Sequence, residues 1–313
     1  MMSIKGLATV AMITYNSSKY LIDAVASVLN SSYKNLELII VDDNSTDNTW
    51  SLIKGLNDKR IRKYKNNSNI GEYPNREYAI SLARGEFFIF IDGDDMIYPW
   101  GLEFIISQIT KFPSAAMALA MQWRDYIFYP YLLSPRENFL FTYFGESFLN
   151  NSFAQTLFRT KLLKEALPFP KGILSGDTFI KKKISLKNQV LMVSGPISWW
   201  RKTPGQASSK LKANYAGFFD SWVIDNLIIN EPDCPLTEKE RLAIKTDRLF
   251  TLKKIILKEL FRFNLPIVIK SLELAPLKNI VFATRRIKPI YKAFSSPEKP
   301  LMISHNECDY SNT

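Results

Sequence analysis

Three short runs of apolar residues constrain the fold of this 313-residue chain more than any other feature. They cover residues 7–14, 36–41 and 87–91, and patterns typical of amphipathic helices separate them. A strand that is apolar at every position is buried on both faces, as in a parallel sheet covered by helices on both sides. We therefore predict an α/β fold of the Rossmann type, with a mostly parallel sheet between two layers of helices.

The first 112 residues show this alternation most clearly. Helices are predicted at 20–28, at 47–56 with Thr46 or Asp47 as the cap, and from Pro74 to Gly85, with a short strand at 61–64. After residue 112 the pattern is less regular. Strands are predicted there at 153–159 and 189–193, with a helix at 177–186. From Thr237 onward the chain is predicted to form helices broken by Pro266, Pro276 and Pro289, followed by a loose tail over 293–313.

Composition excludes several classes of protein. Hydrophobic residues make up 46% of the chain and charged residues 23%, as in an ordinary globular protein. Cys234, Cys308 and the single histidine, His305, fit neither a disulfide framework nor histidine-based acid–base catalysis. We see no signal peptide and no apolar run of about 18 residues. We therefore expect a cytoplasmic protein, which C-terminal helices could hold at the inner face of the cell membrane.

Two acidic clusters follow predicted strands. Asp42-Asp43 ends the second run, and Asp92-Gly93-Asp94-Asp95 directly follows Ile91. In open α/β sheets ligands bind beyond the carboxyl ends of the strands. Three carboxylates in four residues repel one another, and Mg²⁺ or Mn²⁺ shared with a diphosphate relieves that repulsion. The alternative is a solvated acidic turn. A Rossmann dehydrogenase is disfavoured because no G-x-G-x-x-G follows the first strand.

Several motifs occur together in the first 100 residues. They are Thr14-Tyr15-Asn16, the stretch from Ile39 to Thr49, Asn69-x-Gly71, Asn75-Arg76, Ala83-x-Gly85-Glu86 and Phe90 to Asp95. In order and spacing this series resembles the nucleotide-sugar half of family 2 glycosyltransferases of the GT-A fold, in particular those of bacterial surface polysaccharides. The resemblance implies a metal-dependent enzyme that uses Mn²⁺ or Mg²⁺. It would move a hexose or N-acetylhexosamine from a UDP-sugar to an acceptor hydroxyl with inversion.

The resemblance also implies a place for the enzyme in polysaccharide or O-antigen biosynthesis, with a glycan or lipid-linked saccharide as acceptor. Two alternatives stay open. One is the same fold with a GDP- or dTDP-sugar donor, and the other is a non-catalytic module that binds a membrane surface or nucleic acid. The presence of Asp43, Asp94, Asp95 and Asp177 speaks against a binding module, which needs no such set.

The resemblance assigns roles in donor binding. Thr14, Tyr15 and Asn16 would line the base and ribose, and Asp43 would accept a hydrogen bond from the base. Asp42 would be structural or a secondary contact. Arg76 would approach the diphosphate or brace the carboxylates, with a plain salt bridge as its alternative. Asp92, with Gly93, would face the ribose. Either Asp94 or Asp95 would bind the metal.

The acceptor half supplies the remaining candidates. Asp177, in Gly172 to Phe179, best matches the family's catalytic base, and its alternative role is that of an N-cap for the following helix. In the stretch from Trp199 to Ser208, Arg201 is kept, but Thr203 stands where many relatives have a histidine. Arg201 and Lys202 could contact the diphosphate from this loop.

The positive charge of the chain is concentrated near the C-terminus. Residues 238–292 hold 14 Lys and Arg against 5 Asp and Glu, a net charge of +9 out of +11. Leu249, Leu252, Ile256, Leu260 and Phe263 are predicted on one helical face, opposite Lys254, Lys258 and Arg262. Such a helix could bind an anionic membrane surface or pack on the catalytic domain. We expect no nucleic-acid partner, because no recognised motif accompanies the charge.

The predicted domains are 1–235 (halves 1–112 and 113–235), 236–292 and the tail.

Overall fold

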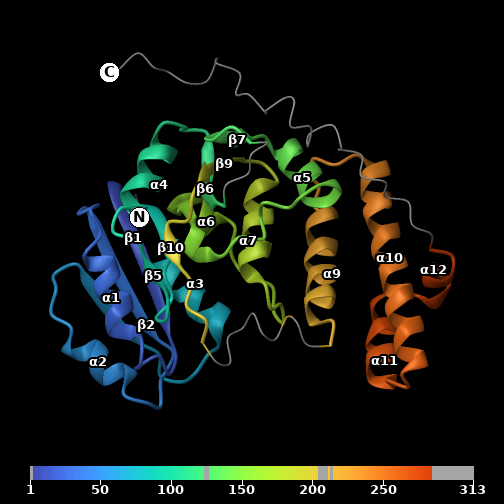
Figure 1. Ribbon diagram of the computed structural model, residues 1–313, viewed down its shortest axis with the longest axis horizontal. Coiled ribbons are helices and arrows are strands. Elements are labelled where there is room, and N and C mark those ends of the chain that lie inside the picture. The colour runs from blue at the N-terminus through green and yellow to red at the C-terminus, as the bar shows by residue number, and fades with distance from the viewer. Residues whose placement is uncertain (1–2, 123–126, 204–210, 212–213, 284–313) are drawn as a thin grey trace.

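The computed structural model describes residues 3–122, 127–203, 211 and 214–283 (Figure 1). The first half contains β1 (Ile4–Thr14), α1 (Leu21–Leu29), β2 (Leu36–Asp42), α2 (Thr49–Gly55), β3 (Ile61–Lys65), α3 (Glu72–Leu82), β4 (Gly85–Phe90), β5 (Met96–Ile97) and α4 (Gly101–Thr110). The second half contains β6 (Ala115–Met121), β7 (Tyr131–Leu133), α5 (Pro135–Phe144), the 3₁₀ turn η1 (Phe153–Gln155), β8 (Thr156–Arg159), α6 (Thr160–Glu165), α7 (Gly176–Ser185), β9 (Gln189–Ser194) and β10 (Ser198–Trp199). The C-terminal helices are α9 (Ala216–Ile229), α10 (Glu238–Phe261), α11 (Leu265–Leu274) and α12 (Leu277–Val281).

One eight-stranded sheet organises the molecule, in the order β3-β2-β1-β4-β8-β6-β9-β7. Strands β1 to β4 are parallel to one another, and β6 is parallel to β9. Strand β8 runs antiparallel to both β4 and β6, and β7 runs antiparallel to β9. The predicted mostly parallel sheet is confirmed, and β5 and β10 form a separate two-stranded sheet.

The sheet buries apolar side chains on both faces, as the apolar strands predicted. Val10 and Met12 of β1 pack on one side with α1 and α4, whereas Ala11 between them packs on the other side with α3. All three side chains are fully buried. Because burying one large apolar side chain stabilises a fold by about 1.5–3 kcal/mol, this double-sided core holds the loops at the strand ends in place.

Several predicted boundaries were wrong. Helix α3 begins at Glu72, after Gly71 with φ 92°, and Gly85 belongs to β4. A Cβ on Gly85 would lie 2.5 Å from the backbone oxygen of Leu7, so its role is close strand packing. Asn48, and neither Thr46 nor Asp47, is the N-cap of α2. Residues 153–155 form a 3₁₀ turn before β8, and helices α4, α5, α6 and α9 were not predicted.

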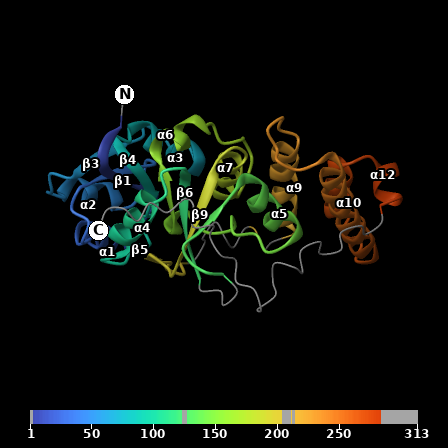
Figure 2. The same ribbon diagram turned by 90° about the horizontal axis from the view of Figure 1, so that it is seen from above.

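The predicted helical C-terminal extension is confirmed, and Figure 2 shows α9 and α10 side by side beyond the sheet. On α10, Ile244 joins the main core, and Leu252 joins a smaller core with residues of α9 and α11. The predicted apolar face was wrong at its end, because Leu260 is 45% and Phe263 is 89% exposed. The proposed boundary at residue 235 stays a proposal, and the predicted break at Pro289 and the tail lie outside the described residues. Within the described ranges, no helix is long and apolar enough to cross a membrane.

Candidate active site

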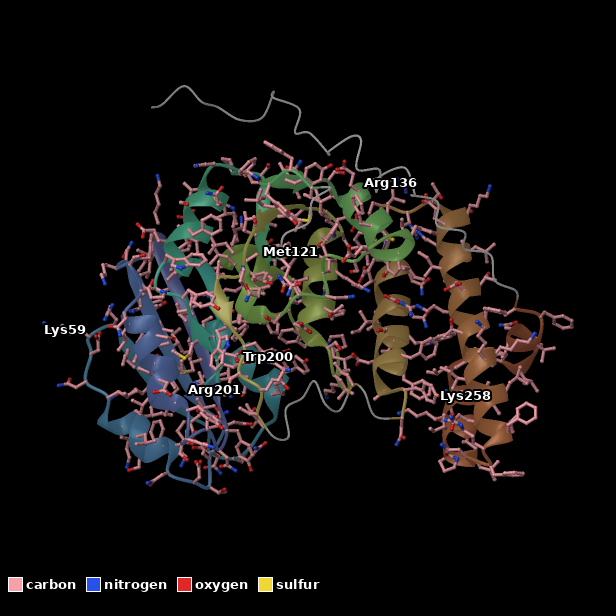
Figure 3. All side chains as sticks on the ribbon, in the orientation of Figure 1. Lys59, Met121, Arg136, Trp200, Arg201 and Lys258 are labelled. Atoms are coloured by element: carbon pink, nitrogen blue, oxygen red, sulfur yellow. The ribbon has the colours of Figure 1, made fainter. Side chains whose placement is uncertain are left out.

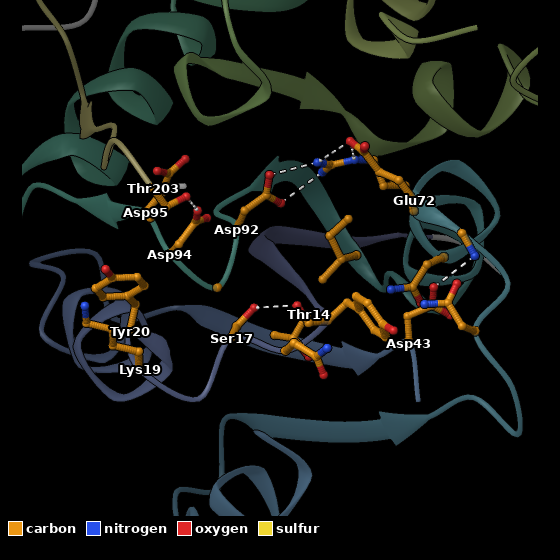
Figure 4. Close-up of a pocket in the computed structure, with 18 of the residues that line it drawn as sticks. Thr14, Ser17, Lys19, Tyr20, Asp43, Glu72, Asp92, Asp94, Asp95 and Thr203 are labelled. Carbon is orange, nitrogen blue, oxygen red and sulfur yellow. Dashed lines mark hydrogen bonds and ion pairs between the residues drawn. The ribbon is translucent and has the colours of Figure 1, made fainter. Parts of the chain in front are cut away.

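A cleft of about 770 Å³ opens at the carboxyl ends of β1, β2 and β4 (Figure 4). From β1 the chain moves outward to β2 and β3, and β4 then lies on the other side of β1. The loops that follow β1 and β4 therefore diverge, which leaves room for a ligand at this edge of the sheet. Residues of these loops, of α3 and of the segment after β10 line the cleft.

The loop after β1 is fixed by the loop after β2. Asn16 has φ 52°, and its side-chain oxygen accepts hydrogen bonds from the backbone N–H groups of Thr46 and Asp47. Asp42 is fully buried and accepts hydrogen bonds from Thr14 Oγ1 and from both the N–H and the hydroxyl of Ser45. Thr14, Tyr15 and Asn16 line the cleft as predicted, whereas Asp42 lies behind them, where its carboxylate holds the two loops together.

Asp43 lies at the end of the cleft away from the acidic cluster and is only 3% exposed (Figure 4). Its Oδ1 accepts hydrogen bonds from Asn66 Nδ2 at 2.8 Å and from the N–H of Ile70 at 2.9 Å. Its Oδ2 accepts one from the N–H of Gly71 at 2.9 Å. Asp43 therefore shapes the loop before α3, and its contact with a donor base stays a proposal.

Arg76 projects from α3 across the floor of the cleft and is only 4% exposed. Its guanidinium pairs with both carboxylate oxygens of Asp92, at 3.0 and 2.8 Å, and with Glu72 at 3.1 Å. It also lies over the rings of Phe90 and Phe153. Burial acts to lower the pKa of Arg76, but the carboxylates of Asp92 and Glu72 raise it above its ordinary value. Arg76 thus braces the acidic cluster as a permanent cation.

The acidic cluster itself forms the opposite end of the cleft. A Cβ on Gly93 would lie 2.9 Å from Thr14 Cγ2, so glycine lets this loop approach the end of β1 closely. Burial raises the pKa of Asp95 to about 7, the hydrogen bond from the N–H of Arg201 opposes this, and the nearby carboxylates of Asp92 and Asp94 add to it. Crowded carboxylates of this kind are the ligands that hard divalent cations prefer. Within the described ranges, however, no group of three or more His, Cys, Asp and Glu side chains forms a metal site.

The segment after β10 closes over the acidic cluster. The antiparallel pair of β5 and β10 positions Arg201, whose N–H donates to Asp95 Oδ1 and whose Nε donates to the backbone oxygen of Asp94, each at 3.0 Å. The Arg201 guanidinium also lies 4.5 Å from the centre of the Tyr20 ring. The Thr203 hydroxyl donates a hydrogen bond to Asp94 Oδ2 at 3.0 Å. No pattern in the sequence predicted the Thr203 contact beyond the place of this residue at the family's histidine position.

Asp177 does not line this cleft. It lies at the edge of a second cavity of about 320 Å³, bordered by α5, α7, α9 and α10. The predicted N-cap role was wrong, because Ser175 is the N-cap of α7 and Asp177 is the second residue of the helix. Its carboxylate is 28% exposed and lies 3.6 Å from Lys181 Nζ. A carboxylate in the first turn is favoured by the helix dipole, and it stays accessible from the cavity.

Tyr73 links the start of α3, beside the cleft, to the start of α7, beside the second cavity. It follows Glu72 of the cleft, and its hydroxyl donates to the backbone oxygen of Leu174 at 2.7 Å and accepts from the N–H of Gly176 at 2.6 Å. A Cβ on Gly176 would lie 2.2 Å from the Tyr73 ring, so only glycine fits there. Burial raises the pKa of Tyr73, and the carboxylates of Glu72 and Asp177 add to this. Helix α3 thereby fixes the start of α7, which contains Asp177.

The second cavity is polar. The hydroxyl groups of Thr142 and Ser147 line it, and both are buried with no hydrogen-bond partner among the described residues. Lys182 of α7 and Arg248 of α10 also line it, and both pair with the buried Asp225 of α9. The cavity thus offers hydroxyl groups and cations beside the Asp177 carboxylate, a set that suits a hydroxyl-rich ligand.

The family model described as Glycosyl transferase family 2 matches residues 9–170, which is more than half of the chain. The chain belongs to this family. The match covers the walls of the cleft as far as Asp95 but ends before Asp177, Arg201 and Thr203.

Curated relatives match a shorter part of the chain. This chain is 39% identical over 89 residues to the Escherichia coli protein named UDP-Glc:alpha-D-GlcNAc-diphosphoundecaprenol beta-1,3-glucosyltransferase WfaP. The aligned region covers 28% of this chain and 36% of that protein. This chain is 32% identical over 107 residues to glycosyltransferase GlyG of Streptococcus pneumoniae, covering 34% of this chain and 36% of that protein. The chain therefore spans about a third of the length of these relatives.

Solved structures match far more of the chain. The TarS fragment 1–349 of Staphylococcus aureus in complex with UDP-GlcNAc aligns with a TM-score of 0.65 and 21% identity, over 87% of this chain and 82% of that one. The mannosyltransferase PcManGT of Pyrobaculum calidifontis, in complex with GDP-Man and Mn²⁺, aligns with a TM-score of 0.60 and 16% identity, over 92% and 81%. At this level of identity the likeness concerns the fold alone, and it confirms the GT-A type.

Proposed function

We propose that this protein transfers a sugar from a UDP-sugar to a hydroxyl group of a saccharide acceptor, with inversion at the anomeric carbon. One observation carries the proposal. A polar cleft with an acidic cluster at one end lies beside a second polar cavity whose edge holds a separate carboxylate, Asp177. The family supports this division, because a glycosyltransferase needs one site for the donor and another for the acceptor.

The donor would occupy the larger cleft. Its base and ribose would lie against Thr14, Tyr15 and Asn16, with Asp43 accepting from the base and Asp92 facing the ribose. UDP is favoured because UDP-Glc stands in the name of the WfaP relative. A GDP-sugar is the alternative, and the GDP-Man in the PcManGT structure is its support.

A divalent cation, Mn²⁺ or Mg²⁺, would sit at the acidic cluster. Asp94 and Asp95 both line the cleft and each carboxylate accepts a hydrogen bond from the segment after β10, and we propose Asp94 as the direct ligand because it is less buried than Asp95. Since fewer than three protein ligands converge among the described residues, donor phosphate oxygens and water would complete the coordination. A bound cation would supply positive charge that partly neutralises the negative charge of the leaving diphosphate.

The acceptor would enter through the second cavity, so that its reacting hydroxyl lies against Asp177. In one in-line displacement the acceptor oxygen forms a bond to the anomeric carbon as the bond from that carbon to the diphosphate oxygen breaks. The hydroxyl proton passes to the Asp177 carboxylate, which acts as the general base from hydrogen-bond distance of the acceptor hydroxyl. The electron pair of the broken bond leaves with UDP.

The acceptor class follows from the relatives. The WfaP name gives GlcNAc-diphosphoundecaprenol as acceptor, and we propose a lipid-linked saccharide of this kind here as well. The transferred group would be a hexose or N-acetylhexosamine. Polysaccharide or O-antigen biosynthesis is the process in which such a transfer takes part.

The metal assignment predicts that UDP and Mn²⁺ bind cooperatively. Because the diphosphate would complete the coordination, Mn²⁺ should raise the affinity for UDP by about 5- to 150-fold, the usual range of coupling between two ligands. Asp94→Asn should abolish most of this gain and leave the affinity for UDP alone nearly unchanged. Titration calorimetry with UDP, with and without Mn²⁺, measures both quantities.

Two further variants make this test specific. Asp95→Asn keeps an oxygen that can accept from the N–H of Arg201, and we expect it to retain most of the cooperativity. Asp233→Asn changes a surface carboxylate paired with Lys187 and should behave as wild type. Equal UDP affinity with and without Mn²⁺ in the wild type would refute the metal site. A loss confined to Asp95→Asn would move the ligand from Asp94 to Asp95.

A further inference from the structure

Several large exposed apolar side chains gather at the turn between α10 and α11. We define the hairpin tip as Leu257, Leu260, Phe261, Phe263, Leu265 and Ile269. Each is at least 45% exposed, and Phe261 and Phe263 reach 85% and 89%. Single exposed apolar residues are ordinary on a protein surface, but six within thirteen residues, two of them aromatic and almost fully exposed, mark an interaction site.

The hairpin tip is not a core face left open. The opposite sides of the same helices pack into a complete small core, in which Leu252 and Ile256 of α10 meet Ile267 and Val268 of α11. Helix α10 therefore has no unpacked apolar stripe along its length with which to lie flat on a surface. The exposed large apolar side chains of α10 are Leu242 near its start and Leu257, Leu260 and Phe261 at the hairpin tip, and Phe282 after α12 is a separate exposed ring.

The turn is held in one shape by a buried acid. Glu259 is 2% exposed and accepts hydrogen bonds from Tyr215 of the segment before α9 and from Asn264. Phe263 has φ 54°, a left-handed conformation that is uncommon for a bulky residue. A strained backbone that surrounding bonds maintain, with an aromatic ring directed to solvent, indicates a function for that ring.

Positive charge surrounds the hairpin tip. Lys254, Lys258, Arg262 and Lys270 are all exposed on α10, α11 and the turn. Across the same described segment, residues 254–274, the only exposed acid is Glu273, since Glu259 is buried. Like charges around the tip oppose its packing against a second copy of the chain, whereas they complement an anionic lipid surface.

We propose that the hairpin tip inserts into the headgroup region of a bilayer that contains anionic phospholipid. The aromatic rings of Phe261 and Phe263 enter the boundary of the acyl chains, and the four cations around them contact lipid phosphates. In Figure 3, Lys258 near the tip and Trp200 and Arg201 at the cleft lie toward the same side of the molecule, the lower half of the view. A membrane bound at the tip would therefore face the side on which the cleft lies.

Vesicle co-sedimentation of the full-length protein tests this proposal without any donor or acceptor, so its result does not depend on the proposed function. We expect binding to vesicles of phosphatidylglycerol and phosphatidylcholine in equal parts, and weak binding to phosphatidylcholine alone. The double variant Phe261→Ala/Phe263→Ala should bind at least about tenfold more weakly, because the inserted apolar area is lost. Lys258→Gln/Arg262→Gln should lose affinity mainly at low salt.

Matched controls keep the result interpretable. Phe128 is 60% exposed and lies outside the hairpin, so Phe128→Ala should bind vesicles as the wild type does. The two rings that the double variant removes are exposed to solvent in the wild type, so its melting temperature should not change. Wild-type affinity in the double variant, or no vesicle binding by the wild type, would overturn the proposal. So would a wild-type dimer in light scattering that the double variant converts to monomer, since the tip would then be a contact between copies.

Discussion

Replacing Asp177 by Asn is expected to lower kcat by about 10²–10⁴-fold, the usual contribution of a general base. Asn keeps the size of the side chain and a place in the first turn of α7, but it cannot take a proton at neutral pH. Asp177 lies in the second cavity, away from the lining of the donor cleft. UDP affinity should therefore stay near its wild-type value. The melting temperature should change little, because Asn can still accept from the buried Lys181, which also donates to the backbone oxygen of Asn151. Steady-state kinetics, calorimetry and thermal unfolding measure the three quantities.

Other carboxylates serve as controls for Asp177. Asp233→Asn alters an exposed acid that also pairs with a lysine, and it should keep wild-type kcat. A variant Asp177→Asn with more than about a tenth of wild-type kcat would exclude Asp177 as the base. The exposed Glu146 of the acceptor half would then be the next residue to change. A fall in melting temperature together with activity would point to a structural role of Asp177.

Replacing Arg76 by Met should destabilise the fold by about 3 kcal/mol, toward the lower end of the range for a broken buried ion pair. Met retains much of the volume between Phe90 and Phe153 but leaves Asp92 and Glu72 without their cation. The cost is at the lower end because these two carboxylates are 31% and 39% exposed and regain some hydration. Urea unfolding at neutral pH measures the free energy of unfolding.

Lys161→Met is the matched control for Arg76. Lys161 pairs with Glu165 on the surface of α6, with both side chains more than half exposed, and such pairs contribute at most about 0.5 kcal/mol. If the free energy of unfolding falls by the same small amount in both variants, the Arg76 ion pairs do not stabilise the acidic cluster. The Arg76 variant should also lose UDP affinity, because Asp92 then lacks its fixed position in the cleft.

The first half of the chain could be predicted largely from the sequence because its signals are local. Apolar runs identify β1, β2 and β4, and the carboxyl ends of parallel neighbours meet at one edge of a sheet. Asp43, Asp92 and Asp94 therefore had to lie at the same edge of the sheet once the strands were recognised, and all three line the cleft. The contacts of each carboxylate could not be predicted from these local signals. Asp42 differs from Asp43 by one position, yet it faces Ser45 and Thr14 behind the cleft.

Contacts between distant segments could not be predicted in the same way. Thr203 bonds to Asp94, and the hydroxyl of Tyr73 bonds to Gly176, across more than a hundred residues in each case. No periodicity or spacing records such a pairing. The C-terminal helix shows the same limit. Leu252, Leu260 and Phe263 share one face in an ideal helix, but α10 ends at Phe261 and the turn directs Phe263 to solvent.

The most direct test of the central claim is acceptor-dependent release of UDP. The full-length protein would be incubated with Mn²⁺, a GlcNAc-diphospho-lipid acceptor and each of several UDP-hexoses and UDP-N-acetylhexosamines in turn. We predict that at least one donor gives UDP release that requires the acceptor, and a product heavier by one sugar, joined with inverted anomeric configuration. GDP- and dTDP-sugars would be tested in parallel. Acceptor-dependent release of GDP or dTDP with none of UDP, or a product with retained configuration, would contradict the account.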